Sequence, residues 1–205
     1  MKNFNKGIFS ASLGSFWWGV LGTYYFQYIS YVGTFEVVMH RSLWTALILL
    51  FTTIFYSKWK SLKNIINDKK KIFVLFITSI LIFCNWSVWI YAVATNRIID
   101  ASLGYFIFPI ISVFFGFLFF KEKLNKRRII SITLVGISIL YLIINFKSLP
   151  WIGLTVALLW SIYNLLRKKI NVETDLGLFI ESLFILPIVI IIFYFLIKNN
   201  LNHFS

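Results

Sequence analysis

Seven apolar runs of about 20 residues constrain this chain more than any other feature. Each run is long enough for a helix to cross the roughly 30 Å hydrocarbon core of a bilayer. A transmembrane strand would instead alternate in polarity over about ten residues, whereas a helix satisfies its own backbone in lipid. We therefore expect an all-α membrane protein with seven transmembrane helices, at residues 7–29, 35–56, 72–95, 102–120, 128–147, 150–169 and 176–197.

The composition agrees with a membrane location. Hydrophobic residues make up 60% of the chain, above the roughly 45–50% of a soluble domain. A net charge of +13 would suggest nucleic acid in a soluble protein, but here the cations gather in short loops between the apolar runs. We expect the lipid bilayer and no nucleic acid among the partners. The first run is longer than a signal-peptide core of about 7–15 residues, so we expect it to remain as an anchor.

The distribution of lysine and arginine predicts an orientation. Of the twenty cations, sixteen fall on one side of the predicted helices and three on the other, while Arg41 lies inside a run. Because cytoplasmic loops are enriched in Lys and Arg, we expect a plasma (inner) membrane protein with a cytoplasmic N-terminus and, after seven spans, an external C-terminus. The sixteen are Lys2, Lys6, Lys58, Lys60, Lys63, Lys69, Lys70, Lys71, Lys121, Lys123, Lys126, Arg127, Arg128, Arg167, Lys168 and Lys169.

Matching stripes of small residues in the first and sixth runs predict an internal repeat. At a constant offset of 146, the stripes are Gly7, Ala11, Ser15 and Gly153, Ala157, Ser161, and the same offset pairs Trp17 with Tyr163. Such stripes let helices approach closely in lipid, so chance matching of generic packing faces is the alternative.

A repeat of five helices must be inverted in the membrane, because five is odd. Inverted repeats around a central site are an architecture of secondary transporters. We therefore divide the chain into a first five-helix repeat, residues 1–148, and the incomplete start of an inverted second repeat, residues 149–205.

The second and seventh runs match around a charged position, with Arg41 in one and Glu181 in the other. An arginine at a bilayer centre costs at least about 2.5–3.5 kcal/mol on insertion scales, which calls for a partner, a wet cavity or an interface. In one interpretation both charges face a central cavity, where Arg41 attracts anionic or polar cargo and Glu181 exchanges a proton.

In the other interpretation the same two charges are anchors. Arg41 then extends outward toward Glu36, and Glu181 extends inward toward Arg167 or Lys168, as long polar side chains near helix ends do. The sequence leaves both interpretations open.

One long segment resembles a known family of transporters. The run NWSVWIYAVATNRIIDASLGYFIFP, from Asn85 to Pro109, is similar to the RarD-like branch of the EamA drug/metabolite transporters. Further similar stretches are HRSLW at 40–44, FKEKL at 120–124, LPWIGL at 149–154, LLRKK at 165–169 and GLFIESLFILP at 177–187.

The resemblance implies ten helices in two inverted repeats of five, with small organic compounds or metabolites as cargo, and it agrees with a proton-coupled exporter. This chain has seven predicted helices, so it is expected to be a truncated product or fragment, or to be completed by partners, whether as a homodimer or with another membrane protein. Phe108 stands where the branch tends to have an asparagine before the helix-four proline.

Two neighbouring helices offer residues for a cavity wall. Asn85 and Trp89 lie four residues apart on one helix face, where they combine an amide with an indole for stacking flat cargo. The alternatives are interhelical hydrogen bonding for Asn85 and an interfacial position for Trp89. The fourth run adds Tyr105 ahead of Pro109, which is expected to kink the helix. The candidate substrate-binding residues are therefore Arg41, Asn85, Trp89, Tyr105 and Glu181.

The sequence offers little for enzyme chemistry. His40 and His203 lie on different segments, and neither an HExxH motif nor a GxxxxGK[ST] loop occurs. Cys84 is the only cysteine, which excludes an intrachain disulfide and a thiolate metal site. Glu122 is expected to be a structural anchor. We expect no enzyme, no cofactor and no metal, but a secondary transporter of small molecules; the alternative is a truncated, non-transporting membrane protein or scaffold.

Overall fold

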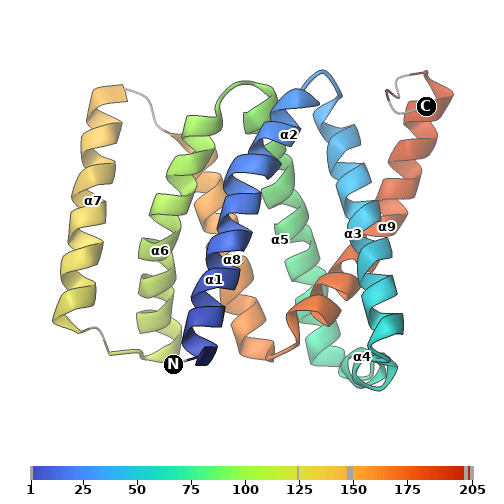
Figure 1. Ribbon diagram of the computed structural model, residues 1–205, viewed down its shortest axis with the longest axis horizontal. Coiled ribbons are helices and arrows are strands. Elements are labelled where there is room, and N and C mark those ends of the chain that lie inside the picture. The colour runs from blue at the N-terminus through green and yellow to red at the C-terminus, as the bar shows by residue number, and fades with distance from the viewer. Residues whose placement is uncertain (1, 124, 147–149, 201–202, 204–205) are drawn as a thin grey trace.

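The computed structural model describes residues 2–123, 125–146, 150–200 and 203, and their regular structure is entirely helical (Figure 1). The all-α prediction is thus confirmed. The elements are α1 (Lys2–Phe16), the π-helical segment η1 (Trp17–Gly22), α2 (Thr23–Tyr28), α3 (Thr34–Phe55), α4 (Trp59–Ile66), α5 (Lys69–Ala94), α6 (Ile98–Phe120), α7 (Lys126–Phe146), α8 (Trp151–Ile170) and α9 (Thr174–Lys198).

Five of the seven predicted spans have the length and apolarity of a crossing helix, namely α3, α5, α6, α7 and α9. The first predicted span is helical up to Tyr28 and consists of α1, η1 and α2. The sixth, α8, ends in Arg167, Lys168 and Lys169, which lower its hydropathy. One helix was not predicted. The short α4 lies in the basic loop after α3 and buries Leu62 and Ile65 on one face.

Consecutive long helices alternate in direction (Figure 1). The N-terminus lies at the lower edge of the view and the C-terminus at the upper edge. The connection that contains α4, the α6–α7 connection and the α8–α9 connection all lie at the lower edge. The basic loops of the sequence therefore share one end of the helices with the N-terminus.

Helix ends follow local chemistry. The carboxylate of Asp68 caps α5 by accepting hydrogen bonds from the backbone N–H groups of Lys70 and Lys71, both at 3.1 Å. A residue with positive φ follows several helices, as in the left-handed ending common at helix C-termini. These residues are Ser57, Asn96, Lys121, Asn171 and Asn200.

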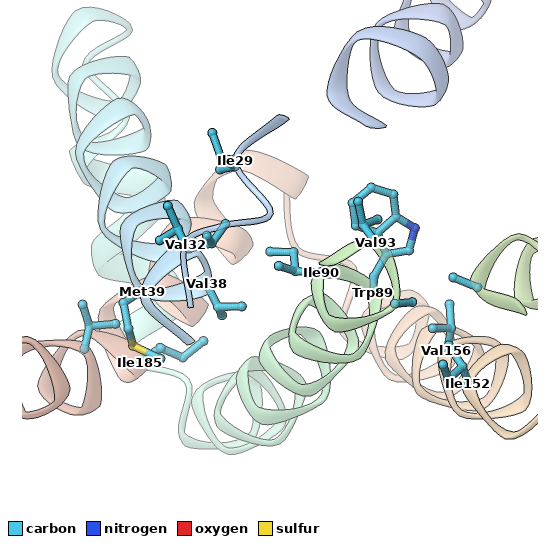
Figure 2. Packing of buried hydrophobic residues seen from close by; sticks show 14 residues of the cluster. Ile29, Val32, Val38, Met39, Trp89, Ile90, Val93, Ile152, Val156 and Ile185 are labelled. Atoms are coloured by element: carbon cyan, nitrogen blue, oxygen red, sulfur yellow. The ribbon is translucent and has the colours of Figure 1, made fainter. Parts of the chain in front are cut away.

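The main hydrophobic core lies between α3, α5, α8 and α9 (Figure 2). Met39 of α3 and Ile185 of α9 belong to it, as do Trp89 of α5 and Val156 of α8. By contrast, α7 packs against α6 at one edge of the molecule, and none of its described side chains is buried. The core therefore joins helices from both of the predicted repeats.

The closest helix contact joins α6 and α8 through two glycines. A Cβ atom added to Gly153 would lie 2.6 Å from the carbonyl oxygen of Asp100, and one added to Gly104 would lie 2.8 Å from that of Gly153. The small residues of the sixth run, Gly153, Ala157 and Ser161, are accordingly buried. The matching residues of α1 are exposed, so the two stripes differ in their surroundings.

Candidate functional site

A cavity of about 450 Å³ lies among the helices and is bounded by η1, α3, α5, α6, α8 and α9. Its walls are mainly aromatic: Trp18, Trp86, Trp89, Tyr105, Trp160 and Tyr163. Polar side chains also line it: Arg41, Asn85, Asn164 and Thr174.

Four of the five predicted substrate-binding residues line this one cavity. Arg41 comes from α3, Asn85 and Trp89 from α5, and Tyr105 from α6. The fifth, Glu181, lies behind the wall, where its carboxylate accepts a hydrogen bond from the hydroxyl of Tyr163, a lining residue, at 3.1 Å. The structure thus brings the predicted set together, and its role in binding cargo stays a prediction.

The guanidinium of Arg41 lies between two indole rings. Its central carbon is 4.1 Å from the ring centroid of Trp86 and 4.7 Å from that of Trp18, within the range of a cation–π interaction. One of its terminal nitrogens, Nη1, is buried without a hydrogen-bond partner among the described residues. The positive charge of Arg41 is therefore stabilised by aromatic rings, and among the described residues Nη1 remains an unpaired hydrogen-bond donor.

Asn85 combines the two roles considered from sequence. Its Nδ2 donates a hydrogen bond to the carbonyl oxygen of Val156 at 3.0 Å, which links α5 to α8, and the residue also lines the cavity. Trp89 is buried, with its ring centroid 5.0 Å from that of Trp18. An indole packed inside the helix assembly does not match the alternative of a lipid-interface position.

The carboxylate of Glu181 is fully buried in a polar network. It accepts a hydrogen bond from Thr78 Oγ1 at 2.6 Å, and Arg167 Nε lies 3.7 Å from its Oε1. Of the two interpretations of the charged pair, the structure therefore gives Glu181 the partner named in the second. Glu36, the outward partner suggested for Arg41, accepts a hydrogen bond from the backbone N–H of His203 at 2.9 Å.

Several residues of the site were missed from sequence. Thr78 looked like an ordinary helix threonine, whereas Arg167 was among the predicted partners of Glu181. The offset of 146 paired Tyr163 with Trp17, but Trp17 is 66% exposed and its neighbour Trp18 lines the cavity instead. The π-helical turn of η1 begins at Trp17, and such a turn changes which side chains face inward.

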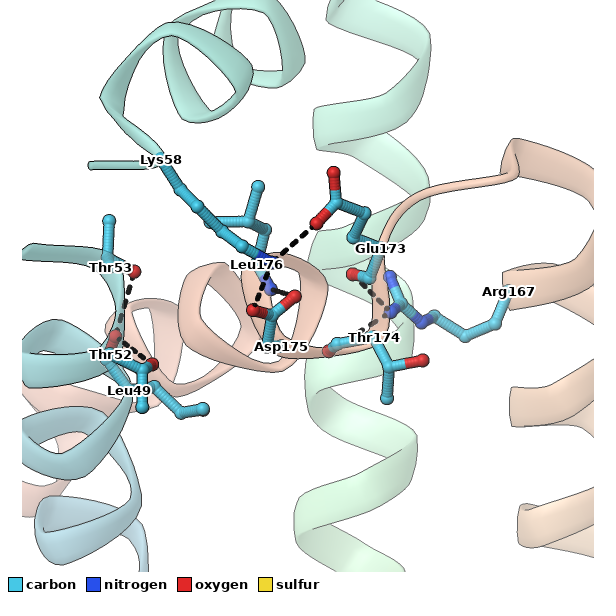
Figure 3. Close-up of polar contacts among 9 residues, drawn as sticks. All are labelled: Leu49, Thr52, Thr53, Lys58, Arg167, Glu173, Thr174, Asp175 and Leu176. Carbon is cyan, nitrogen blue, oxygen red and sulfur yellow. Dashed lines mark hydrogen bonds and ion pairs between the residues drawn. The ribbon is translucent and has the colours of Figure 1, made fainter. Parts of the chain in front are cut away.

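An ionic cluster joins the α3–α4 turn to the start of α9 (Figure 3). Lys58 Nζ lies 2.6 Å from Glu173 Oε2 and 2.7 Å from Asp175 Oδ2. These hydrogen bonds, first to Asp175 and then to Glu173, raise the pKa of Lys58 to about 12. Arg167 donates to the backbone carbonyls of Glu173 and Thr174, and Thr174 lines the cavity. The cluster therefore borders the cavity at Thr174.

A second hollow, of about 660 Å³, lies between α6, α7 and α8. Its acid, Glu122, is paired with Lys168 at 2.7 Å, and this hydrogen bond lowers the pKa of Glu122. The predicted site residues lie outside this hollow. Among the described residues, no cluster of three His, Cys, Asp or Glu side chains could hold a metal ion.

Comparison with known proteins identifies relatives over nearly the whole chain. The sequence profile described as the EamA-like transporter family matches residues 5–144. Protein RarD of Escherichia coli (strain K12) is 32% identical over 202 residues, which are 98% of this chain and 68% of that protein. An uncharacterized transporter of Vibrio cholerae is 34% identical over 182 residues, 89% of this chain and 60% of that protein.

The uncharacterized transporter YojE of Bacillus subtilis is 30% identical over 186 residues, 89% of this chain and 62% of that protein. The chain thus spans 60–68% of the length of these three relatives. No solved structure matches. The family resemblance expected from the sequence is confirmed: the chain belongs to the EamA-like transporter family.

Proposed function

We propose that the chain acts as a secondary transporter of small organic compounds or metabolites across the inner membrane, with the 450 Å³ cavity as its cargo site. One observation carries the proposal. Arg41, Asn85, Trp89 and Tyr105, chosen from sequence alone, line a single cavity to which α8 and α9 also contribute residues. Such a site lies between the two proposed repeats, as expected when they move against each other to give alternating access.

Glu181 is the proposed proton carrier. It is a buried carboxylate one hydrogen bond away from the cavity, because the Tyr163 hydroxyl bridges the two. Intramembrane carboxyl groups commonly serve in proton relays. In this proposal the seven helical segments all cross the membrane, with the N-terminus in the cytoplasm, where the basic loops gather.

A second candidate is a non-transporting membrane protein or scaffold. The observation that favours it is length, since the chain spans only 60–68% of the three relatives compared here.

The experiment compares metabolites exported by cells that carry the chain, its Arg41→Gln and Trp89→Leu variants, or an empty vector. Mass spectrometry of the medium should show compounds that depend on the chain and fall to the empty-vector level in both variants. Arg97→Gln is the matched control, because Arg97 also lies near a tryptophan, Trp151, but is paired with Asp100 away from the cavity.

The same chain extended by the C-terminal helices of a longer relative separates the two candidates. Export by the extended protein alone would support the non-transporting candidate for this chain. Export that survives Arg41→Gln and Trp89→Leu at normal expression would remove the cavity as the cargo site.

A further inference from the structure

The charge balance of the cavity is positive. Arg41 is the only lining residue, among those described, with a formal charge. Glu181, the buried acid that is hydrogen-bonded to Tyr163, is not a lining residue and has Arg167 beside it at 3.7 Å, so its charge is already balanced. A guanidinium stays protonated in proteins. The cavity therefore attracts an anion and repels a cation.

Three hydrogen-bond donors that line the cavity are already used within the protein. Asn85 Nδ2 donates to Val156, Asn164 Nδ2 donates to the carbonyl oxygen of Trp160 at 2.7 Å, and Trp18 Nε1 donates to the Tyr105 hydroxyl at 3.3 Å. Arg41 Nη1, by contrast, is buried without a partner in the described part of the chain. Among the described lining residues, Arg41 is therefore a charged donor with an unpaired N–H group.

The surroundings of Arg41 determine how a ligand can approach it. The central carbon of the guanidinium lies over the rings of Trp18 and Trp86, and the N–H groups of a guanidinium lie along its planar edge. A carboxylate matches that edge, since its two oxygens can accept two parallel N–H bonds.

The rest of the cavity offers flat, apolar faces. Trp160 and Tyr163 stack with ring centroids 5.2 Å apart and planes 9° apart, and both line the cavity. Aromatic walls of this kind favour a planar, conjugated ligand over a saturated one, because ring stacking adds to burial. A zwitterion would lack an acid among the described lining residues for its ammonium group.

We propose that the cavity binds a flat, conjugated organic anion, with an aromatic carboxylate on the Arg41 edge and its ring between the aromatic walls. This inference rests on the proposed function and assigns the class of its cargo.

The test measures binding to the purified chain in nanodiscs of zwitterionic lipid by isothermal titration calorimetry. Four ligands of nearly equal size are compared at neutral pH: 2-naphthoate, 2-naphthamide, 2-naphthylmethylammonium and decahydro-2-naphthoate. We expect 2-naphthoate to bind about tenfold or more tightly than the amide, as a charge-assisted bidentate contact implies. We expect the ammonium compound to show no binding and the saturated acid to bind about tenfold more weakly than 2-naphthoate.

Variants locate the effect. Arg41→Gln should remove the advantage of the carboxylate over the amide, whereas Trp86→Leu should weaken both. Arg97→Gln should change neither. The wild-type comparison needs no variant, so it remains decisive if Arg41→Gln does not fold.

Equal affinity for carboxylate and amide overturns the anion assignment, and equal affinity for the flat and saturated acids overturns the planar one. Absence of binding by all four ligands at millimolar concentration overturns both. Export by cells is measured separately. Selective binding without export would contradict the transport proposal but would still support the proposed class of ligand.

Discussion

The hydroxyl of Thr78 provides a test of the buried carboxylate at the scale of one residue. It donates to Glu181 Oε1 at 2.6 Å in a fully buried setting. Thr78→Val keeps the shape of the side chain and leaves that oxygen without this donor. We expect a loss of about 1–3 kcal/mol in the free energy of unfolding, the usual cost of an unsatisfied buried polar group, measured by denaturant titration in detergent.

Thr45→Val is the matched control. The Thr45 hydroxyl donates to the carbonyl oxygen of Arg41 in its own helix at 2.7 Å, and that carbonyl belongs to the helical backbone. We expect its effect on unfolding to be within about 0.5 kcal/mol. Equal losses for the two variants would mean that Thr78 contributes nothing special to Glu181.

At the scale of single residues, the sequence identified site residues of types that are rare in lipid and missed site residues of types that are common there. Arg41 and Glu181 were conspicuous because a charge inside an apolar run is costly. Thr78 and Trp160 were not, since threonine bonds its own helix backbone and tryptophan anchors helices at interfaces. Only the packing of α5, α8 and α9 shows that Thr78 meets Glu181 and that Trp160 stacks on Tyr163.

The α6–α8 contact provides a test at the scale of an element. Gly153→Leu places a side chain where even a Cβ would lie 2.6 Å from the Asp100 carbonyl. We expect a loss of at least about 1–3 kcal/mol, the usual cost of overpacking, seen as earlier unfolding in a denaturant titration. Gly136→Leu in α7 is the control, because a Cβ there meets nothing within 4 Å. A Gly153→Leu protein as stable as the control would contradict the close contact.

The Lys58 cluster gives a prediction for pH. The pKa of Lys58 is raised to about 12, above its unfolded value of about 10.4. A raised lysine pKa adds stability that is complete below about pH 10.4 and is lost as the pH rises through about 12. The difference in melting temperature between wild type and Lys58→Gln should therefore be constant between about pH 7 and pH 10 and shrink at higher pH.

Added salt should also shrink that difference, because the cluster is partly exposed and is screened by ions. Lys60→Gln, a change of an exposed lysine in α4, is the comparison. If the difference in melting temperature between wild type and Lys58→Gln is unchanged by both added salt and high pH, the lysine acts instead through packing of its methylene chain.

Helix positions were predicted well from apolar length, and irregular features were not. All seven predicted ranges are helical where the structure describes them, except at the terminal residues Ile29, Tyr56, Thr95 and Pro150. The short α4 was missed because its eight residues are half basic and polar and have only a narrow apolar face, Leu62 and Ile65. The π turn of η1 leaves no mark in hydropathy, since it changes the backbone and not the residue types.

The alternating course of the helices gives a prediction for the whole molecule. The N- and C-termini lie at opposite ends of the helices (Figure 1), and the basic loops share the end of the N-terminus. A reporter fused after Ser205 should therefore read external, while one fused before Met1 should read cytoplasmic. A cytoplasmic signal from the C-terminal fusion would contradict either the seven crossings or their orientation.

At this scale, charge and helix count predicted the alternation, but the sequence did not show which helices touch. Contacts of α9 with α3 and of α8 with α6 depend on side-chain fit between apolar surfaces that look alike in sequence. The exposed stripe of α1 and its buried counterpart in α8 illustrate this, because the same spacing of small residues occurs in both.

The wide turn of η1 determines how the side chains of α1 are rotated about the helix axis relative to those of α2. Each α-helical residue turns the chain by about 100°, and a π turn, with its i to i+5 hydrogen bonds, takes up about one residue more. Deleting Val20, whose side chain is 51% exposed, would restore α-helical phase and rotate Trp18 by about 100° relative to α2. The indole would then leave the guanidinium of Arg41, so a residue on the outside of the helix sets the aromatic surroundings of a charge on the inside.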